Sequence, residues 1–229
     1  MKKLLSLVLA ALMLLSFAAC SGNSGNGGQT ANVTQEPTEA PTEEPKMSKE
    51  EMLEIAVEAK DNEINNAIYD NVAKAQYSYC GKVLLITGDI YKIEADHICL
   101  NDAYVSIDVY LPIEDIVKLE NRQSIVIVGE TDDSFIDGKV TVAGTELSSQ
   151  QLVVRNAYLV SEYFELTGKL ISVGGYGLVM ESGSVIYPDF SQIDSSVLES
   201  LVGETVTFNA KRYINSAYQY YHVLIEIVK

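Results

Sequence analysis

The sequence predicts a mainly β protein in which a long N-terminal helix precedes two small five-stranded barrels, each with a short helix between its third and fourth strands. Three observations lead to this fold class. Apolar residues recur at helical spacing after residue 48, and from residue 82 onward they alternate with polar residues. The order of the alternating segments then repeats at an offset of about eighty residues.

The first twenty residues have the layout of an export signal. Lys2 and Lys3 precede an apolar run from residue 4 to residue 17, which ends in two alanines and Cys20. The run is shorter than the roughly 20 residues that a spanning helix needs. The segment resembles a bacterial lipoprotein signal, which implies removal of residues 1–19 and lipidation of the Cys20 thiol. We therefore expect a lipid-anchored protein on the extracytoplasmic face of a bacterial membrane, with ordinary secretion as the alternative.

Residues 20–47 are predicted to be a tether. After Cys20 the segment is rich in Gly, Ser and Asn, then in Pro, Thr and Glu, and it has almost no apolar side chains. Such a segment cannot bury enough surface to offset the entropy lost on ordering. We expect a spacer between the membrane and the folded part of the chain, with a proline-rich ligand motif as the alternative.

The charge balance disfavours nucleic acid as a partner. The chain has 16 basic and 32 acidic residues, and loss of Lys2 and Lys3 with the signal changes the net charge from −16 to −18. Phosphate binding needs Lys and Arg gathered on one face, and the sequence contains no such cluster.

Residues 48–78 are predicted to form one amphipathic helix that packs on the first barrel. Ser48 and Glu51 match an S-x-x-E capping box, which marks a helix start. Apolar residues follow at three- and four-residue spacing to about Ala75, and Lys60 interrupts this stripe once.

The first barrel is assigned to residues 79–160, where the spacing of apolar residues changes to two. Between residues 104 and 111, Val105, Ile107 and Val109 form an apolar set, so this strand should have one buried and one wet face. Asp137-Gly138 predicts a hairpin turn.

The two cysteines of the predicted barrel are expected to be free thiols. A turn near Asp96 sets Cys99 opposite Tyr91 and leaves Cys80 about eleven residues farther along its strand. That separation is several times the roughly 7 Å that a disulfide allows between Cα atoms.

The second barrel is assigned to residues 161–229 because the same order of segments recurs there. Residues 164–170 match residues 84–90, and Gly168 falls at the position of Gly88. These glycines are predicted to permit the bend that a first strand needs in a small barrel. Ser191 with Asp194 predicts a helix cap where the repeat requires a helix.

Five strands with a helix between the third and fourth is the order of the OB-fold. Further residues make the likeness specific: Asn71, Lys74-Ala75, Tyr79, Gly81-Lys82, Ile86-Thr87-Gly88-Asp89-Ile90 and Ile93. This pattern resembles the opening of the tRNA-anticodon-like OB family found in bacterial lipoproteins and exported proteins, over residues 68–160. The resemblance implies a fold, and the family name by itself implies no nucleic-acid binding.

Candidate ligand-binding residues lie on the outer face of the second and third strands of the first barrel, where OB barrels usually bind. Tyrosine is in excess, with 14 Tyr against 5 Phe and no Trp. The candidates are Tyr91, Tyr104, Ser106, Asp108 and Tyr110. Tyrosine rings can stack on sugars or bases or make protein contacts. The alternative is that they cover half-exposed strand surface without any ligand.

The sequence predicts no catalytic residue, no cofactor and no metal site. His97 and His222 lack the spacing of metal ligands, and the acidic residues of 132–138 lack the spacing of a calcium loop. No G-x-S-x-G, Walker or Rossmann glycine pattern occurs.

These observations favour a non-enzymatic, membrane-tethered binding or assembly module. Its expected partners are the membrane, through lipid on Cys20, and a protein, peptide or glycan ligand. The alternative is a nucleic-acid-binding surface lipoprotein, which the fold permits and the charge disfavours. An enzyme with an unrecognised site is the third class.

Overall fold

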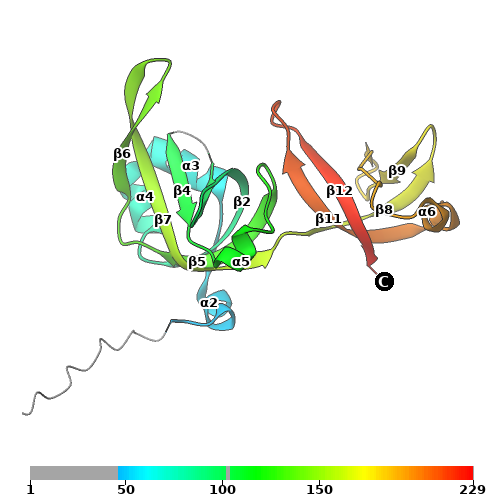
Figure 1. Cartoon of the computed structure of the whole chain (residues 1–229), viewed down its shortest axis with the longest axis horizontal. Helices are drawn as coiled ribbons and strands as arrows, with labels where there is room; N and C mark the ends of the chain where they lie inside the picture. Colours follow the sequence, from blue (N-terminus) through cyan, green and yellow to red (C-terminus); the bar gives the residue numbers. More distant parts are fainter. Residues whose placement is uncertain (1–45, 102–103, 229) are drawn as a thin grey trace, which may run out of the picture. The chain divides into compact units, whose positions relative to one another are not determined.

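The computed structural model of the chain describes residues 46–101 and 104–228 (Figure 1). The predicted signal and Cys20 lie outside the described residues, and so does the predicted tether except for its last two residues. Within the described ranges, every helix is too short or too polar to cross a membrane.

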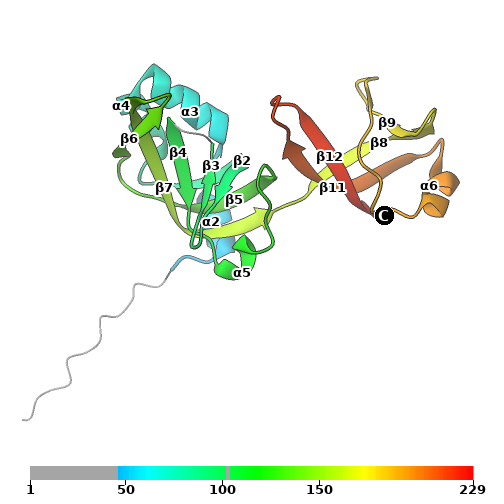
Figure 2. The ribbon, with the colours of Figure 1, turned by 45° about the horizontal axis from the view of Figure 1, so that its top comes forward.

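Five strands close a barrel in the first half of the chain (Figures 1 and 2). They are β2 (Val83–Ile93), β3 (Ile98–Leu100), β4 (Val105–Val109), β5 (Ser124–Thr131) and β7 (Thr145–Ser161). Pairing runs in the order β2-β3-β4-β7-β5, and β5 pairs back onto β2. The β4–β7 pair is parallel, whereas the other four pairs are antiparallel. The prediction of a mainly β protein with a five-stranded barrel is confirmed.

Alternation along the strands fills the barrel. Ile98 and Leu100 of β3 and Val105, Ile107 and Val109 of β4 all belong to one buried apolar cluster. The residues between them therefore lie on the outer face of the barrel. A short helix, α5 (Ile113–Ile116), connects β4 to β5 and buries Ile116 in the same cluster.

Residues 48–78 do not form the single helix that the sequence predicts. The structure has α2 (Lys49–Ile55), the strand β1 (Val57–Lys60), α3 (Asp61–Asp70) and α4 (Val72–Tyr79) in this region. The capping box at Ser48 and Glu51 is present, as predicted.

The chain leaves the helical conformation because barrel strand β2 offers an unpaired edge. β3 pairs only with residues 90–93 of β2, so β1 can pair in parallel with residues 84–87. Asn71 then separates the last two helices, since its backbone is extended and its side chain accepts a hydrogen bond from the Lys74 N–H at 3.0 Å. α3 packs against β2 and β4.

The hairpin turn predicted at Asp137-Gly138 is also wrong. Both residues lie inside β6 (Ile136–Val142), which pairs with β7, and the chain turns at Ala143 and Gly144. These two residues have φ values of 49° and 82°. Positive φ at both central positions is what a two-residue hairpin turn of the I′ type requires.

The second half of the chain forms a separate sheet. Its elements are β8 (Phe164–Ser172), β9 (Tyr176–Val179), β10 (Val185–Ile186), α6 (Ser195–Leu201), β11 (Thr205–Ile214) and β12 (Tyr220–Val228). The strands pair in the open order β10-β9-β8-β11-β12, and an isolated parallel bridge joins Asp189 to Val223. The predicted order of elements is present, whereas a second closed barrel stays a prediction.

Gly129 of β5 is a position where a side chain does not fit. A Cβ atom there would lie 2.6 Å from Cγ1 of Val154 and 3.1 Å from Cα of Ala157. We expect Gly129→Ala to lower the free energy of unfolding by about 1–3 kcal/mol, because backbone and strand would have to move.

Gly138→Ala is the matched control in β6. The close contact of its Cβ would be with the movable Oγ of Ser149, at 2.8 Å, so we expect a smaller loss, under about 1 kcal/mol. Urea unfolding of both variants measures the difference. If both variants lost the same free energy of unfolding, the close contact at Gly129 would not limit which residue β5 can carry there.

Candidate functional site

The outer side of β3 and β4 gathers polar and aromatic side chains. Alternation places Cys99 on the outer side of β3, and the antiparallel register pairs it with Asp108 of β4. Two residues before Asp108, Ser106 lies on the same side of β4. His97 directly precedes β3 and lies close to both Cys99 and Asp108. We call this surface the β3–β4 face and define it by six residues: His97, Cys99, Tyr104, Ser106, Asp108 and Tyr110.

Four of the five predicted ligand-binding residues belong to the β3–β4 face, and Tyr91 does not. The predicted pairing of Cys99 with Tyr91 is wrong by one residue, because Cys99 pairs with Lys92 and a bulge falls at Tyr91. Tyr91 is 57% exposed and lines a separate cavity of about 630 Å³. The sequence contains no turn or bulge signal strong enough to fix this register.

Asp108 is buried, although its position in the strand predicts a solvent-exposed side chain. The residue as a whole is only 5% exposed. Ser106 Oγ donates to one carboxylate oxygen of Asp108, and Gln151 Nε2 of the neighbouring β7 donates to the other. The cost of burying the charge is thus reduced by hydrogen bonds to both oxygens.

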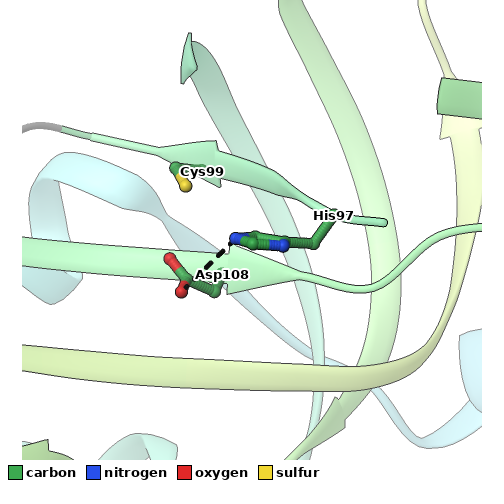
Figure 3. A group of neighbouring side chains, drawn as sticks. All are labelled: His97, Cys99 and Asp108. Carbon is green, nitrogen blue, oxygen red and sulfur yellow. Dashed lines mark ion pairs between the residues drawn. The ribbon is translucent and has the colours of Figure 1, made fainter. Parts of the chain in front are cut away.

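The His97 ring stacks on Tyr110. Figure 3 shows that it also faces Asp108. Its centroid is 5.0 Å from that of Tyr110, and the two planes differ by 26°. Nδ1 is 2.8 Å from Oδ1 of Asp96, and Nε2 is 3.7 Å from Oδ2 of Asp108. A carboxylate accepts hydrogen bonds, so the Nδ1–H donates to Asp96. In the neutral ring, Nε2 then presents a lone pair toward Asp108.

Cys99 forms a compact group with His97 and Asp108. One donor atom each from His97, Cys99 and Asp108 can be chosen so that all three lie within 4.8 Å of one another. Burial is the main cause that raises the pKa of the Cys99 thiol to about 11, and the charge of Asp108 adds to it. Cys80 and Cys99 are both free, as the sequence predicts.

Sequence reasoning missed this group because its residues do not follow a metal-binding spacing. The usable signal is weaker: an H-x-C pair on one side of a strand, with an acidic residue opposite in the next strand. That signal becomes specific only when the strand register is known, since a shift of one residue moves every side chain to the other face.

The two tyrosines at the ends of the β3–β4 face have different surroundings. The Tyr104 ring packs against Tyr69 of α3, with centroids 6.4 Å apart and planes tilted by 58°. Tyr110 contacts His97 on the face, and the Arg155 guanidinium lies 5.5 Å from its ring centroid. Tyr110 also lines a cleft of about 410 Å³ together with Arg155 and Tyr158. A ligand-binding role for either ring stays a prediction.

The cavity beside Tyr91 contains a hydrogen-bonded carboxylate. Tyr220 donates from its hydroxyl to Oδ2 of Asp89 at 2.8 Å, and Ser124 Oγ donates to the other oxygen. Burial is the first cause that raises the pKa of Tyr220 to about 12, followed by its hydrogen bond to Asp89. The Tyr220 hydroxyl therefore stays protonated, and a donor, at neutral pH.

Tyr104 offers a direct test between packing and binding. We expect Tyr104→Ala to lower the free energy of unfolding by about 1–2 kcal/mol, because the aromatic contact with Tyr69 is lost. Tyr91→Ala is the control, and we expect a change within about 0.5 kcal/mol because that ring is largely exposed. Chemical denaturation measures both. A negligible effect of Tyr104→Ala would leave the ring free to contact a ligand.

Comparison with known proteins identifies no family for this chain. No protein-family model matches it, and no curated protein matches it. One solved structure that matches is a "putative nucleic acid-binding lipoprotein" from Klebsiella pneumoniae subsp. pneumoniae, at 16% sequence identity. The match covers 50% of this chain and 99% of the other, with a TM-score of 0.34. A likeness of this extent supports no assignment of function.

Proposed function

We propose that the chain is a non-enzymatic, lipid-anchored binding module of a bacterial cell envelope, in which an OB-like barrel binds a protein, peptide or glycan. The order of strands in the closed barrel carries the proposal. Numbered along the barrel, the first strand pairs with the second and fourth, and the third pairs in parallel with the fifth. With a helix between the third and fourth strands, this arrangement supports an OB-like Greek-key barrel.

The β3–β4 face is the proposed binding surface because β3 and β4 are the second and third strands of that barrel. OB barrels bind oligonucleotides and oligosaccharides on this face and the loops beside it. Tyr110 offers a ring next to a cleft, and beside it lies the guanidinium of Arg155, which pairs with Asp132. An aromatic ring next to a charged group can bind a sugar or a peptide side chain.

We propose that residues 161–229 are a second, divergent OB-like unit. The order of strands and helix matches that of the five strands and α5 of the first barrel. The bridge between Asp189 and Val223 is parallel, as is the β4–β7 pair between the third and fifth strands of that barrel. We place the boundary between residues 160 and 161, beside the end of β7 at Ser161 and before the start of β8 at Phe164.

Lipid anchoring through Cys20 rests on the sequence of residues 1–20. We expect Cys20→Ser to release the protein from the membrane fraction, because the thiol that would carry the lipid is absent. Cys80→Ser is the control and should leave the protein anchored. Fractionation and mass spectrometry of the mature N-terminus measure both. A mature protein that begins at another residue and lacks lipid would contradict the proposal.

Ligand binding is tested with the Cys20→Ser chain against arrays of peptides and envelope oligosaccharides. We expect Tyr110→Ala to weaken binding of the selected ligand by about tenfold or more, as for an aromatic residue at the centre of an interface. Tyr77→Ala, an exposed tyrosine of α4 outside the β3–β4 face, is the matched control and should bind normally. Circular dichroism verifies that each variant is folded.

A single-stranded oligonucleotide at two salt concentrations tests the alternative function. We expect no binding, because the chain has twice as many acidic as basic residues. Tight binding that weakens steeply with salt would replace the proposed ligand with nucleic acid. Unchanged binding of the array ligand by Tyr110→Ala would instead exclude the β3–β4 face as the binding surface.

A further inference from the structure

We propose that His97, Cys99 and Asp108 form a binding site for a divalent transition-metal ion of the Zn²⁺ type. The site lies on the β3–β4 face, and the proposal does not depend on which ligand that face binds. The three residues provide one imidazole nitrogen, one thiolate sulfur and one carboxylate oxygen. This is a donor set that Zn²⁺ accepts readily.

The orientation of the His97 ring is the first argument. Asp96 holds the proton on Nδ1, so Nε2 points its lone pair toward a carboxylate oxygen of Asp108 at 3.7 Å. Two electron-rich atoms that face each other repel unless positive charge lies between them. A metal ion between them would supply that charge, and the sulfur of Cys99 is near enough to be its third ligand.

The spacing of the donor atoms is the second argument. Zn²⁺ binds nitrogen and oxygen at about 2.0–2.2 Å and sulfur at about 2.3 Å, so donors at tetrahedral corners lie roughly 3.3–3.7 Å apart. The distance of 3.7 Å between Nε2 of His97 and Oδ2 of Asp108 is slightly longer than the roughly 3.6 Å that bonds of 2.2 Å give for a nitrogen–oxygen pair. All three donor atoms lie within 4.8 Å of one another, so side-chain rotations alone bring the sulfur close enough.

The residues around the three donors are the third argument. A metal-binding histidine usually donates its other N–H to a carboxylate or carbonyl, as His97 does to Asp96. A metal-binding carboxylate is usually held by further hydrogen bonds, as Asp108 is by Ser106 and Gln151. Both features orient ligands before an ion arrives.

The donor set also indicates which ions the site would bind and how many coordination positions of the ion would stay open. A thiolate and an imidazole disfavour Mg²⁺ and Ca²⁺, which prefer oxygen ligands. Three protein ligands leave a fourth tetrahedral position for water or for a group of a bound partner. When the ion binds, the Cys99 S–H bond breaks, the sulfur keeps the electron pair, and the proton leaves to solvent.

Metal titration of the metal-free Cys20→Ser chain tests the proposal. We expect Zn²⁺ to bind one equivalent and to raise the melting temperature. Co²⁺ in the same site should give the near-ultraviolet absorption of a cobalt–thiolate bond. Calorimetry with a competing chelator measures the affinity.

Variants at the three ligands and matched controls make the test specific. We expect Cys99→Ser, His97→Ala and Asp108→Asn each to weaken Zn²⁺ binding by more than about 100-fold, and Asp96→Asn by about tenfold. Cys80→Ser and His222→Ala change the same residue types outside the site and should bind Zn²⁺ normally. The melting temperature without metal identifies any variant that fails to fold.

Two results would overturn the proposal. One is Zn²⁺ binding weaker than about 1 mM by the parent chain, which would show that the three residues do not form a metal site. The other is an equal loss of affinity in Cys80→Ser and Cys99→Ser. Neither result affects the proposed ligand binding, which is measured with chelator present through Tyr110→Ala.

Discussion

The pairing of β5 with β2 is the interaction on which the first barrel depends. Residues 83–89 of β2 pair with residues 124–130 of β5, and this ladder converts a sheet with two edges into a closed ring. β2 must then pair with β5 along one edge and with β1 and β3 along the other. The first part of β2 pairs with β1 and the last part pairs with β3. A bulge at Tyr91 increases the local bend of the strand.

Close approach at Gly88 supports the same closure. A Cβ atom at this position would lie 3.0 Å from Cδ1 of Leu100 and 3.1 Å from Cβ of Asp61. The glycine thus lets both the core and the start of α3 reach the backbone of β2. Asp61 uses this proximity, since its carboxylate accepts a hydrogen bond from the Asp89 N–H at 3.0 Å. Burial raises the pKa of Asp61, whereas this bond and the one from the Asn62 N–H oppose the shift.

The β3–β4 face is a consequence of closure. With the apolar residues of β3 and β4 inside the barrel, the residues between them are forced outward and into register with one another. Cys99 and Asp108 become direct partners, and His97 stacks on Tyr110. Cys99 and Asp108 are therefore held by strand pairing, and His97 directly precedes β3. Side chains held on paired strands suit a preformed binding site.

The sequence by itself determined the features that depend on local physics. Alternation of apolar residues predicted the mainly β fold, and Ser48 with Glu51 predicted the start of a helix. Distance along the chain predicted that Cys80 and Cys99 stay free. Each of these inferences needs only side-chain periodicity, a local hydrogen bond or the length of a strand.

Only the tertiary structure decided the features that depend on pairing between distant residues. β1 replaces part of a predicted helix because β2 has an open edge there, and the turn falls at Ala143-Gly144 because β6 pairs along its full length with β7. Because of the bulge at Tyr91, Cys99 pairs with Lys92 instead of Tyr91, and Tyr91 is separated from the other candidate residues. Gln151 is distant in sequence but lies on the neighbouring strand β7, and its side chain donates a hydrogen bond to the Asp108 carboxylate. Such contacts arise from the register of whole strands, which short stretches of sequence do not encode.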